Sequence, residues 1–248
     1  MGKLHKSRTP EAWAAGFPGR RLVTTALAAS LAVGVYLLGV RPRLMRWGAT
    51  PDEASEPLAG DGLVADARLQ FTRAVTIRTP VSQVWPWLMQ IGAGRAGFYT
   101  YDALENSIGL GIHSADRIVP AFQHLKVGDI IPLHPDGGVP VRLLEPGAVL
   151  GLGGTMNYFT GAIGQPGEPA PARRLDLSWT FMLRSVDERT TRLVSRTRYG
   201  YTSAAVGVAL RVLLEPIQFL MERKMLLGIR DRAERADRSA EGGHPERL

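Results

Sequence analysis

The chain has no cysteine among its 248 residues. Disulfide bonds, thiolate catalysis and cysteine-ligated metals are therefore excluded together. Histidine is also scarce, with five residues in all, and three of them, His113, His124 and His134, are too widely spaced to form a local pair of ligands. We expect neither a bound metal nor a cofactor.

The short motifs that mark common enzyme classes are missing as well. There is no G-x-S-x-G nucleophile elbow, no Walker phosphate loop and no H-E-x-x-H zinc motif. The sequence GAGRAG, residues 92–97, does match the G-x-G-x-x-G dinucleotide fingerprint. That fingerprint needs a strand before its glycines, whereas the pattern here predicts a helix before them. We therefore interpret GAGRAG as a turn between two helices.

Acidic residues are in the minority, with a net charge of +7, but the imbalance is local. Residues 1–46 hold eight basic residues and one acid, so the rest of the chain, with 22 of each, is neutral. Nucleic-acid binding needs a basic surface that neutralises phosphates. We therefore expect no nucleic-acid partner.

One apolar run without a charge, LVTTALAASLAVGVYLLGV, covers residues 22–40. As a helix it would be about 28 Å long, enough to cross a bilayer. A cleaved signal peptide and a buried soluble helix are the alternatives, but basic residues follow the run where a small-residue cleavage site would stand. We expect a single-pass anchor in the cell membrane. Five basic residues before the run and three after it favour a cytoplasmic N-terminus.

These features divide the chain into five parts. We expect a basic tail at 1–21, a transmembrane helix at 22–40, a solvated linker rich in proline, glycine and acids at 41–65, one domain at 66–236, and a disordered tail at 237–248. The 45% hydrophobic content is enough for a real core in the domain.

Alternating polar and apolar residues predict three strands. The first covers residues 71–78, and the second covers 175–183, with Trp179 on its apolar face. A partner strand follows the turn at residues 187–189. We expect its arginines, Arg192, Arg196 and Arg198, to face water, and we expect Ser195, Thr197 and Tyr199 on the other side to face a cavity.

Helical patterns frame the domain. Thr79 is a candidate N-cap with Pro80 in the first helical position, and Pro86 should kink or shorten the helix that follows. Residues 203–235 predict a long helix, kinked at Pro216. We expect a core helix rather than a second membrane span because charged residues interrupt it. Its expected apolar stripe consists of Val206, Leu210, Leu213, Ile217, Leu220 and Met221.

Three segments together resemble the bacterial SRPBCC superfamily (START-like, polyketide cyclase/dehydrase-type) over roughly residues 66–236. They are VWPWLMQIGAGRAGFYTYDALENSIGLGIHSADRI, LKVGDIIPL and EPIQFLMERKMLLGIRDRAE. The resemblance implies an α+β helix-grip fold, in which a curved antiparallel sheet wraps a long C-terminal helix around a mostly apolar cavity. Members named for lipid transfer, aromatic ring cyclisation and stress response share the cavity but not one chemistry.

Two functions remain open at this point. The first is membrane-anchored binding, transport or presentation of a hydrophobic small molecule such as a lipid or polyketide. The second is a cyclase, dehydratase or hydrolase in which His113 and Asp116 transfer protons. A domain that fills its cavity with its own side chains would instead be a scaffold. The resemblance and the strand pattern together assign the expected ligand-binding residues: Tyr99, Tyr101, His113, Trp179 and Tyr199. The sequence decides neither the ligand nor the oligomeric state.

Overall fold

The computed structural model describes residues 18–107, 109, 111–134, 137–157 and 174–242. The chain divides into two compact units, Met1–Arg43 and Leu44–Leu248. In the first unit the apolar run is helical throughout, as α1 (Pro18–Val35) and the π-helical turn η1 (Tyr36–Val40). The short helix α2 (Arg41–Met45) contains the boundary between the units.

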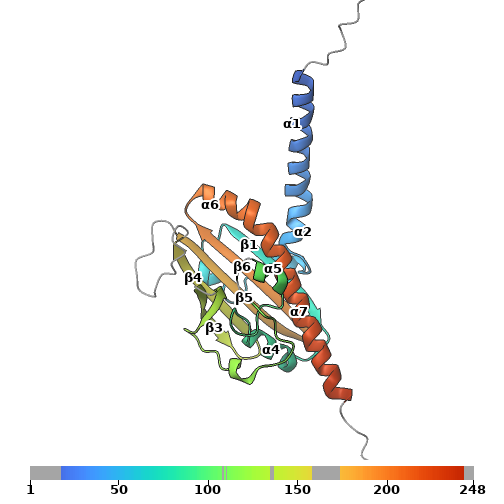
Figure 1. The fold of residues 1–248 in the computed structure, drawn as a ribbon, viewed down its shortest axis with the longest axis vertical. Coiled ribbons are helices and arrows are strands. Elements are labelled where there is room, and N and C mark those ends of the chain that lie inside the picture. Colours follow the sequence, from blue (N-terminus) through green and yellow to red (C-terminus); the bar gives the residue numbers. More distant parts are fainter. Residues whose placement is uncertain (1–17, 108, 110, 135–136, 158–173, 243–248) are drawn as a thin grey trace, which may run out of the picture. The chain divides into compact units, whose positions relative to one another are not determined.

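A six-stranded antiparallel sheet forms the second unit, with the strand order β1-β6-β5-β4-β3-β2 (Figure 1). The strands predicted at 71–78 and 175–183 are confirmed, together with the partner of the second. The strands are β1 (Leu69–Ile77), β2 (Ile130–His134), β3 (Gly137–Glu145), β4 (Val149–Asn157), β5 (Arg174–Asp187) and β6 (Thr190–Tyr201).

A long C-terminal helix lies across one face of this curved sheet (Figure 1). It consists of α6 (Ala204–Ala209), the π-helical turn η4 (Leu210–Leu214) and α7 (Glu215–Gly242). The expected α+β helix-grip fold is therefore confirmed. The other helical segments of the unit are α3 (Pro51–Ser55), η2 (Asp61–Val64), α4 (Val81–Met89), α5 (Asp102–Ser107) and η3 (Pro120–Phe122).

The start of α4 differs from the prediction. Pro80 is the N-cap, and Thr79 lies buried before it, with its hydroxyl donating to the Arg78 carbonyl and its own carbonyl accepting from Thr191 Oγ1 at 2.6 Å. Thr79 therefore ties the helix entry to β6 instead of capping the helix. The helix contains Pro86 and is only nine residues long, as expected.

GAGRAG is a closed turn between α4 and α5, as predicted. Gly92 and Gly97 exchange backbone hydrogen bonds of 3.0 and 3.1 Å across it. The guanidinium of Arg95 folds back and donates to the carbonyls of Met89 and Phe122. A helix precedes the glycines, so the dinucleotide geometry does not form.

Proline shapes the C-terminal helix through a π turn. Pro216 cannot donate to the carbonyl of Val212, and η4 precedes it with wider i→i+5 bonding. Pro42 follows η1 with the same spacing. The π turn also changes the helical phase, so the expected apolar stripe is only partly buried: Leu210 is buried, whereas Leu213, Ile217 and Leu220 are exposed.

One helix among the described residues, Ala204–Ser239, is long and apolar enough to cross a membrane. Its second half contributes Met225, Leu226, Ile229 and Ala233 to the main hydrophobic core, against α4 and the sheet. The prediction of a core helix is confirmed for this half.

The segment expected to be a solvated linker belongs to the folded second unit from Leu44 onward. The helix α3 begins with a complete capping box between Thr50 and Glu53. Trp47 packs against the main core, and its carbonyl accepts from the Ala74 amide at 3.1 Å. The folded unit therefore starts about twenty residues earlier than the composition of the segment indicates.

Acid–arginine pairs hold this segment on the sheet face opposite α7. Side chains alternate along β6, so Arg192, Arg196 and Arg198 point away from the cavity side. Glu53 pairs with Arg192 at 2.7 Å, and Asp61 pairs with Arg196 at 2.8 Å and with Arg198 at 3.1 Å. The expectation that these arginines face water is wrong, most clearly for Arg196, which is 3% exposed.

The C-terminal tail also differs from the expected boundary. The helix α7 continues to Gly242. The last part of the tail, residues 243–248, lies outside the described residues.

Candidate functional site

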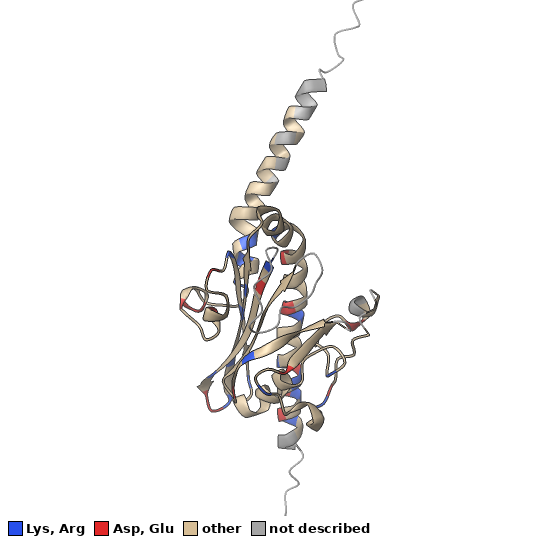
Figure 2. Cartoon of the chain, turned by 90° about the vertical axis from the view of Figure 1, so that its left-hand side faces the viewer, with Lys and Arg blue, Asp and Glu red and all other residues tan. Residues whose placement is uncertain are grey.

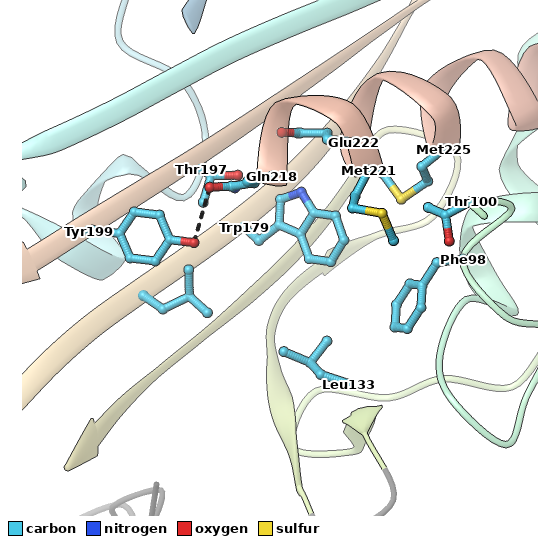
Figure 3. Close-up of a pocket in the computed structure, with 11 residues that line it drawn as sticks. Phe98, Thr100, Leu133, Trp179, Thr197, Tyr199, Gln218, Met221, Glu222 and Met225 are labelled. Atoms are coloured by element: carbon cyan, nitrogen blue, oxygen red, sulfur yellow. Dashed lines mark hydrogen bonds between the residues drawn. The ribbon is translucent and has the colours of Figure 1, made fainter. Parts of the chain in front are cut away.

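A cavity of about 230 Å³ lies between α7 and strands β5 and β6 (Figure 3). The strands contribute one alternating face each, the helix contributes side chains spaced three and four residues apart, and β2 and the segment after Gly97 complete the wall. The lining residues are Phe98, Thr100, Leu133, Leu177, Trp179, Thr197, Tyr199, Gln218, Met221, Glu222 and Met225.

The walls are mainly apolar and aromatic. The Trp179 ring lies 4.8 Å from the Phe181 ring and 6.3 Å from the Phe98 ring, centroid to centroid. Met221 and Met225 face the cavity from α7 (Figure 3). Methionine side chains are flexible and polarisable, so this side of the cavity can adapt to the shape of a ligand.

Few polar groups reach the cavity. Thr197 Oγ1 is buried and has no hydrogen-bond partner among the described residues. The Tyr199 hydroxyl donates to Gln218 Oε1 at 3.3 Å (Figure 3). A buried hydroxyl without a partner costs free energy, because it has lost its hydrogen bonds to water. The cavity therefore offers one hydroxyl that a ligand can satisfy.

A buried charged network forms one end of the site. Trp179 Nε1 donates to Ser195 Oγ at 3.1 Å, and Ser195 Oγ donates to Glu222 Oε1 at 2.5 Å. Arg73, from β1, is fully buried and donates to the other carboxylate oxygen of Glu222. Its Nε donates to the Leu44 carbonyl at 3.1 Å. Both oxygens of Glu222 are thus engaged, and the pair as a whole carries no net charge.

Tyr199 keeps its proton in this environment. Burial raises the pKa of its hydroxyl well above the usual range, and the nearby Glu222 carboxylate raises it further. Tyr199 is therefore a hydrogen-bond donor rather than a base at neutral pH.

The structure brings together only some of the predicted site residues. Trp179 and Tyr199 line the cavity, and Thr197 faces it as the strand pattern indicates. Tyr99 is not among the lining residues: it is buried, and its hydroxyl donates to the Trp87 carbonyl and accepts from Gln90 Nε2. Tyr101 is 42% exposed, outside the described cavity lining.

The two residues proposed for proton transfer lie at the surface. His113 is exposed and is not part of the cavity lining. The Asp116 carboxylate is also exposed and forms an ion pair with Arg232 at 3.0 Å. Their catalytic role therefore stays a prediction from the sequence, without a shared cavity to support it.

Sequence reasoning missed Phe98, Gln218 and Glu222. Glu222 carried little signal of its own, because Arg223 and Lys224 beside it are also charged. Arg73 carried a clearer signal, because it lies among the apolar residues of its strand. Among the described residues, no group of three or more His, Asp or Glu side chains is placed to hold a metal ion.

No known family profile matches this sequence, and a comparison with curated proteins finds no match. Solved structures with a similar fold include a hypothetical protein from Helicobacter pylori, at 12% identity and a TM-score of 0.42, covering 75% of this chain and 99% of that one. Norcoclaurine synthase from Thalictrum flavum has 11% identity and a TM-score of 0.40, with 68% and 96% covered.

A polyketide-cyclase-like protein from Corynebacterium glutamicum is also similar, at 14% identity and a TM-score of 0.31, with 71% of this chain and 96% of that chain covered. These similarities concern the fold alone and assign no ligand. The antiparallel sheet and the long C-terminal helix across it form a helix-grip fold.

Proposed function

We propose that the protein binds a hydrophobic small molecule with one polar group in the cavity beneath α7, while residues 22–40 anchor it in a membrane. The observation that carries the proposal is Thr197 Oγ1, a buried hydroxyl without a partner in a mainly apolar cavity. Ligand sites typically combine apolar walls with a few polar groups that fix the orientation of the ligand.

The size of the cavity narrows the ligand class. A cavity of about 150 Å³ accommodates benzene, and drug-sized ligands occupy about 300–1,000 Å³. A volume of about 230 Å³ therefore suits a single ring or a short acyl segment. A longer lipid or polyketide would place only part of its length in this space.

The anchor is supported by composition and by secondary structure. Residues 22–40 carry no Lys, Arg, Asp or Glu, and the described parts of this helix are tan in Figure 2. The run is helical in both α1 and η1, so its backbone polar groups are satisfied internally, as a bilayer requires. We keep the predicted orientation, with the N-terminus in the cytoplasm, as part of the proposal.

Binding is better supported than proton-transfer catalysis. Glu222 is the carboxylate in the cavity wall, and Arg73 and Ser195 already occupy its two oxygens. His113 and Asp116 lie outside the lining. If the second function were correct, His113→Ala would abolish turnover of a hydrophobic substrate while ligand binding survived.

Native mass spectrometry with organic extraction, on the full chain purified in mild detergent, tests the binding proposal. We expect a co-purified hydrophobic molecule in stoichiometric amount. Met221→Trp should exclude it by filling the cavity, and Thr197→Val should reduce its occupancy by removing the hydroxyl. Leu220→Trp is the matched control, because Leu220 is next to Met221 in the sequence but its own side chain is exposed and is not part of the cavity lining. An empty wild-type protein, or a ligand retained in Met221→Trp, would contradict the proposal.

A further inference from the structure

The first half of the C-terminal helix exposes a continuous set of large apolar side chains. We call this set the apolar ridge; its members are Val208, Val212, Leu213, Ile217 and Leu220, each between 56% and 65% exposed. Between Ala204 and Leu220 the only exposed charged residue is Arg211, since Glu215 is fully buried. Contiguous exposed apolar surface of this kind marks a site of contact with a protein or a membrane.

Packing within the domain does not account for the ridge. The opposite side of the same helix is already buried, because Leu210 packs in a cluster with Phe71 and Tyr199. The helix is packed on the sheet in this structure, because Met221 and Glu222 line the cavity and Met225 lies in the main core. The ridge is therefore an outer surface of a helix that stays on the domain.

We propose that the apolar ridge docks into the surface of the lipid bilayer in which the chain is anchored. The inference rests on the anchor in the proposed function. Met45 and Leu214 both pack against the hydrophobic cluster that contains Leu210, so Met45 lies near the ridge half of the helix. Val40, the end of the apolar run, precedes Met45 by five residues, a chain length of at most about 18 Å. The chain length thus limits how far Met45, beside the Leu210 cluster, can lie from the end of the proposed anchor.

The charges beside the ridge suit an anionic lipid surface. Arg46, Arg211 and Arg223 are exposed, and the Arg223 guanidinium lies 5.1 Å from the centre of the Trp47 ring. Tryptophan and arginine side chains favour the headgroup level of a bilayer, where basic groups are attracted to anionic lipids. An apolar ridge with flanking basic residues is the pattern of a helix that lies in the interface.

Because the chain has no cysteine, single-cysteine labelling can test the docking directly. We would place one fluorophore at a time on Leu213→Cys, Leu31→Cys or Val186→Cys of the full chain, in vesicles of phosphatidylcholine and phosphatidylglycerol. Nitroxide-labelled phosphatidylcholine then reports contact with lipid. Val186 is the control: it is 62% exposed and lies eleven residues along β5 from Leu175, roughly 36 Å away.

We expect labels at Leu213 and Leu31 to lose most of their emission and the label at Val186 to keep it. If Leu31 is quenched and Leu213 is not, the docking inference fails while the anchor stands. If neither is quenched, the anchor fails and the inference fails with it. Energy transfer between Leu213 labels on separate chains, without lipid quenching, would assign the ridge to a second copy and overturn the inference. Unchanged circular dichroism of each variant verifies the fold.

Discussion

Arg73 and Glu222 are two charged residues at positions that the backbone assigns to the interior. Arg73 is fully buried on the first strand of the domain, and Glu222 is 4% exposed on α7. Rings of Phe71 and Phe219 lie 4.9 and 5.5 Å from the guanidinium carbon and add cation–π contact. A buried ion pair costs free energy to desolvate. Replacing both partners removes that cost, whereas replacing one partner leaves the other as an unpaired buried charge and lowers stability more.

We predict that Glu222→Gln or Arg73→Met alone destabilises the protein by about 3–5 kcal/mol, because each leaves a buried charge without its partner. The double variant Arg73→Met with Glu222→Met should recover most of the loss. Thermal unfolding followed by circular dichroism measures the effect, with a drop of roughly 10 °C expected for each single variant. Asp231→Asn, which removes an exposed ion pair with Arg230, is the control and should change little. Additive effects in the double variant would contradict the prediction.

At the scale of single residues, the sequence predicts the strand face of the site better than the helix face. Strict alternation places Trp179, Thr197 and Tyr199 on one side of the sheet, and the structure agrees. On the helix, charge alone marked Glu222 as unsuited to a buried position. Its partner lies 149 residues away in the chain, so their mutual neutralisation becomes visible only in three dimensions.

The segment from Leu44 to Ala65 acts as a cover for the outer face of the sheet. Arg196 lies at its centre: it donates to Asp61 Oδ2 and to the carbonyls of Glu53 and Glu56. Burial lowers the pKa of Arg196, and the Asp61 charge opposes that shift. The planar guanidinium supplies donors to several acceptors at once, which a lysine ammonium cannot reproduce with the same geometry.

We predict that Arg196→Lys loosens this cover while leaving the cavity intact. Amide hydrogen exchange should become at least several-fold faster in residues 50–64 and stay unchanged in β5. The control is Arg184→Lys, because Arg184 pairs with Glu56 through side chains that are 41% and 36% exposed. Equal effects of both substitutions would show that the buried position of Arg196 is not what holds the segment.

The contribution of Glu53 to the stability of this cover depends on pH. The hydrogen bond from Arg192 lowers the pKa of Glu53 below its ordinary value of 4.5, although burial opposes the shift. A lowered pKa in the folded state means that the contribution to stability is complete above the unfolded value and is lost as the pH falls through the folded one.

We therefore expect Glu53→Gln to reduce stability at neutral pH and to flatten the loss of stability on acidification. Melting temperatures of the variant and the wild type, measured between about pH 3 and pH 7, should converge at the acid end. A constant difference across this range would rule out the ion pair as its source.

The composition of this segment explains why its structure was not predicted. Proline, glycine and acidic residues in close succession are typical of a solvated tether. The arginines that neutralise those acids lie more than 130 residues later, on a strand whose alternation indicates only that they share a face. Local sequence predicts the strands and helices here, but not which distant segment covers them.

For the molecule as a whole, the position of the domain boundary has a direct consequence. The compact unit begins at Leu44, and the Leu44 carbonyl accepts a hydrogen bond from the buried Arg73. We predict that residues 44–248 fold with an intact core, whereas residues 66–248 lose the cover and expose Arg196. Thermal unfolding and hydrogen exchange of the two truncations provide the test. Similar melting temperatures for both would place the boundary after the cover.

The π turn at Leu210–Leu214 determines how the ridge side chains before it are rotated about the helix axis relative to the cavity-lining side chains after it. A π turn is in effect one residue inserted into an α-helix. Deleting a single residue there would rotate the preceding turns by about 100° relative to the cavity-lining side chains. Ridge residues such as Val208 would then turn away from their outward direction. One codon gained or lost at this turn therefore decides whether the ridge faces outward or turns away, while the cavity-lining half of the helix keeps its place.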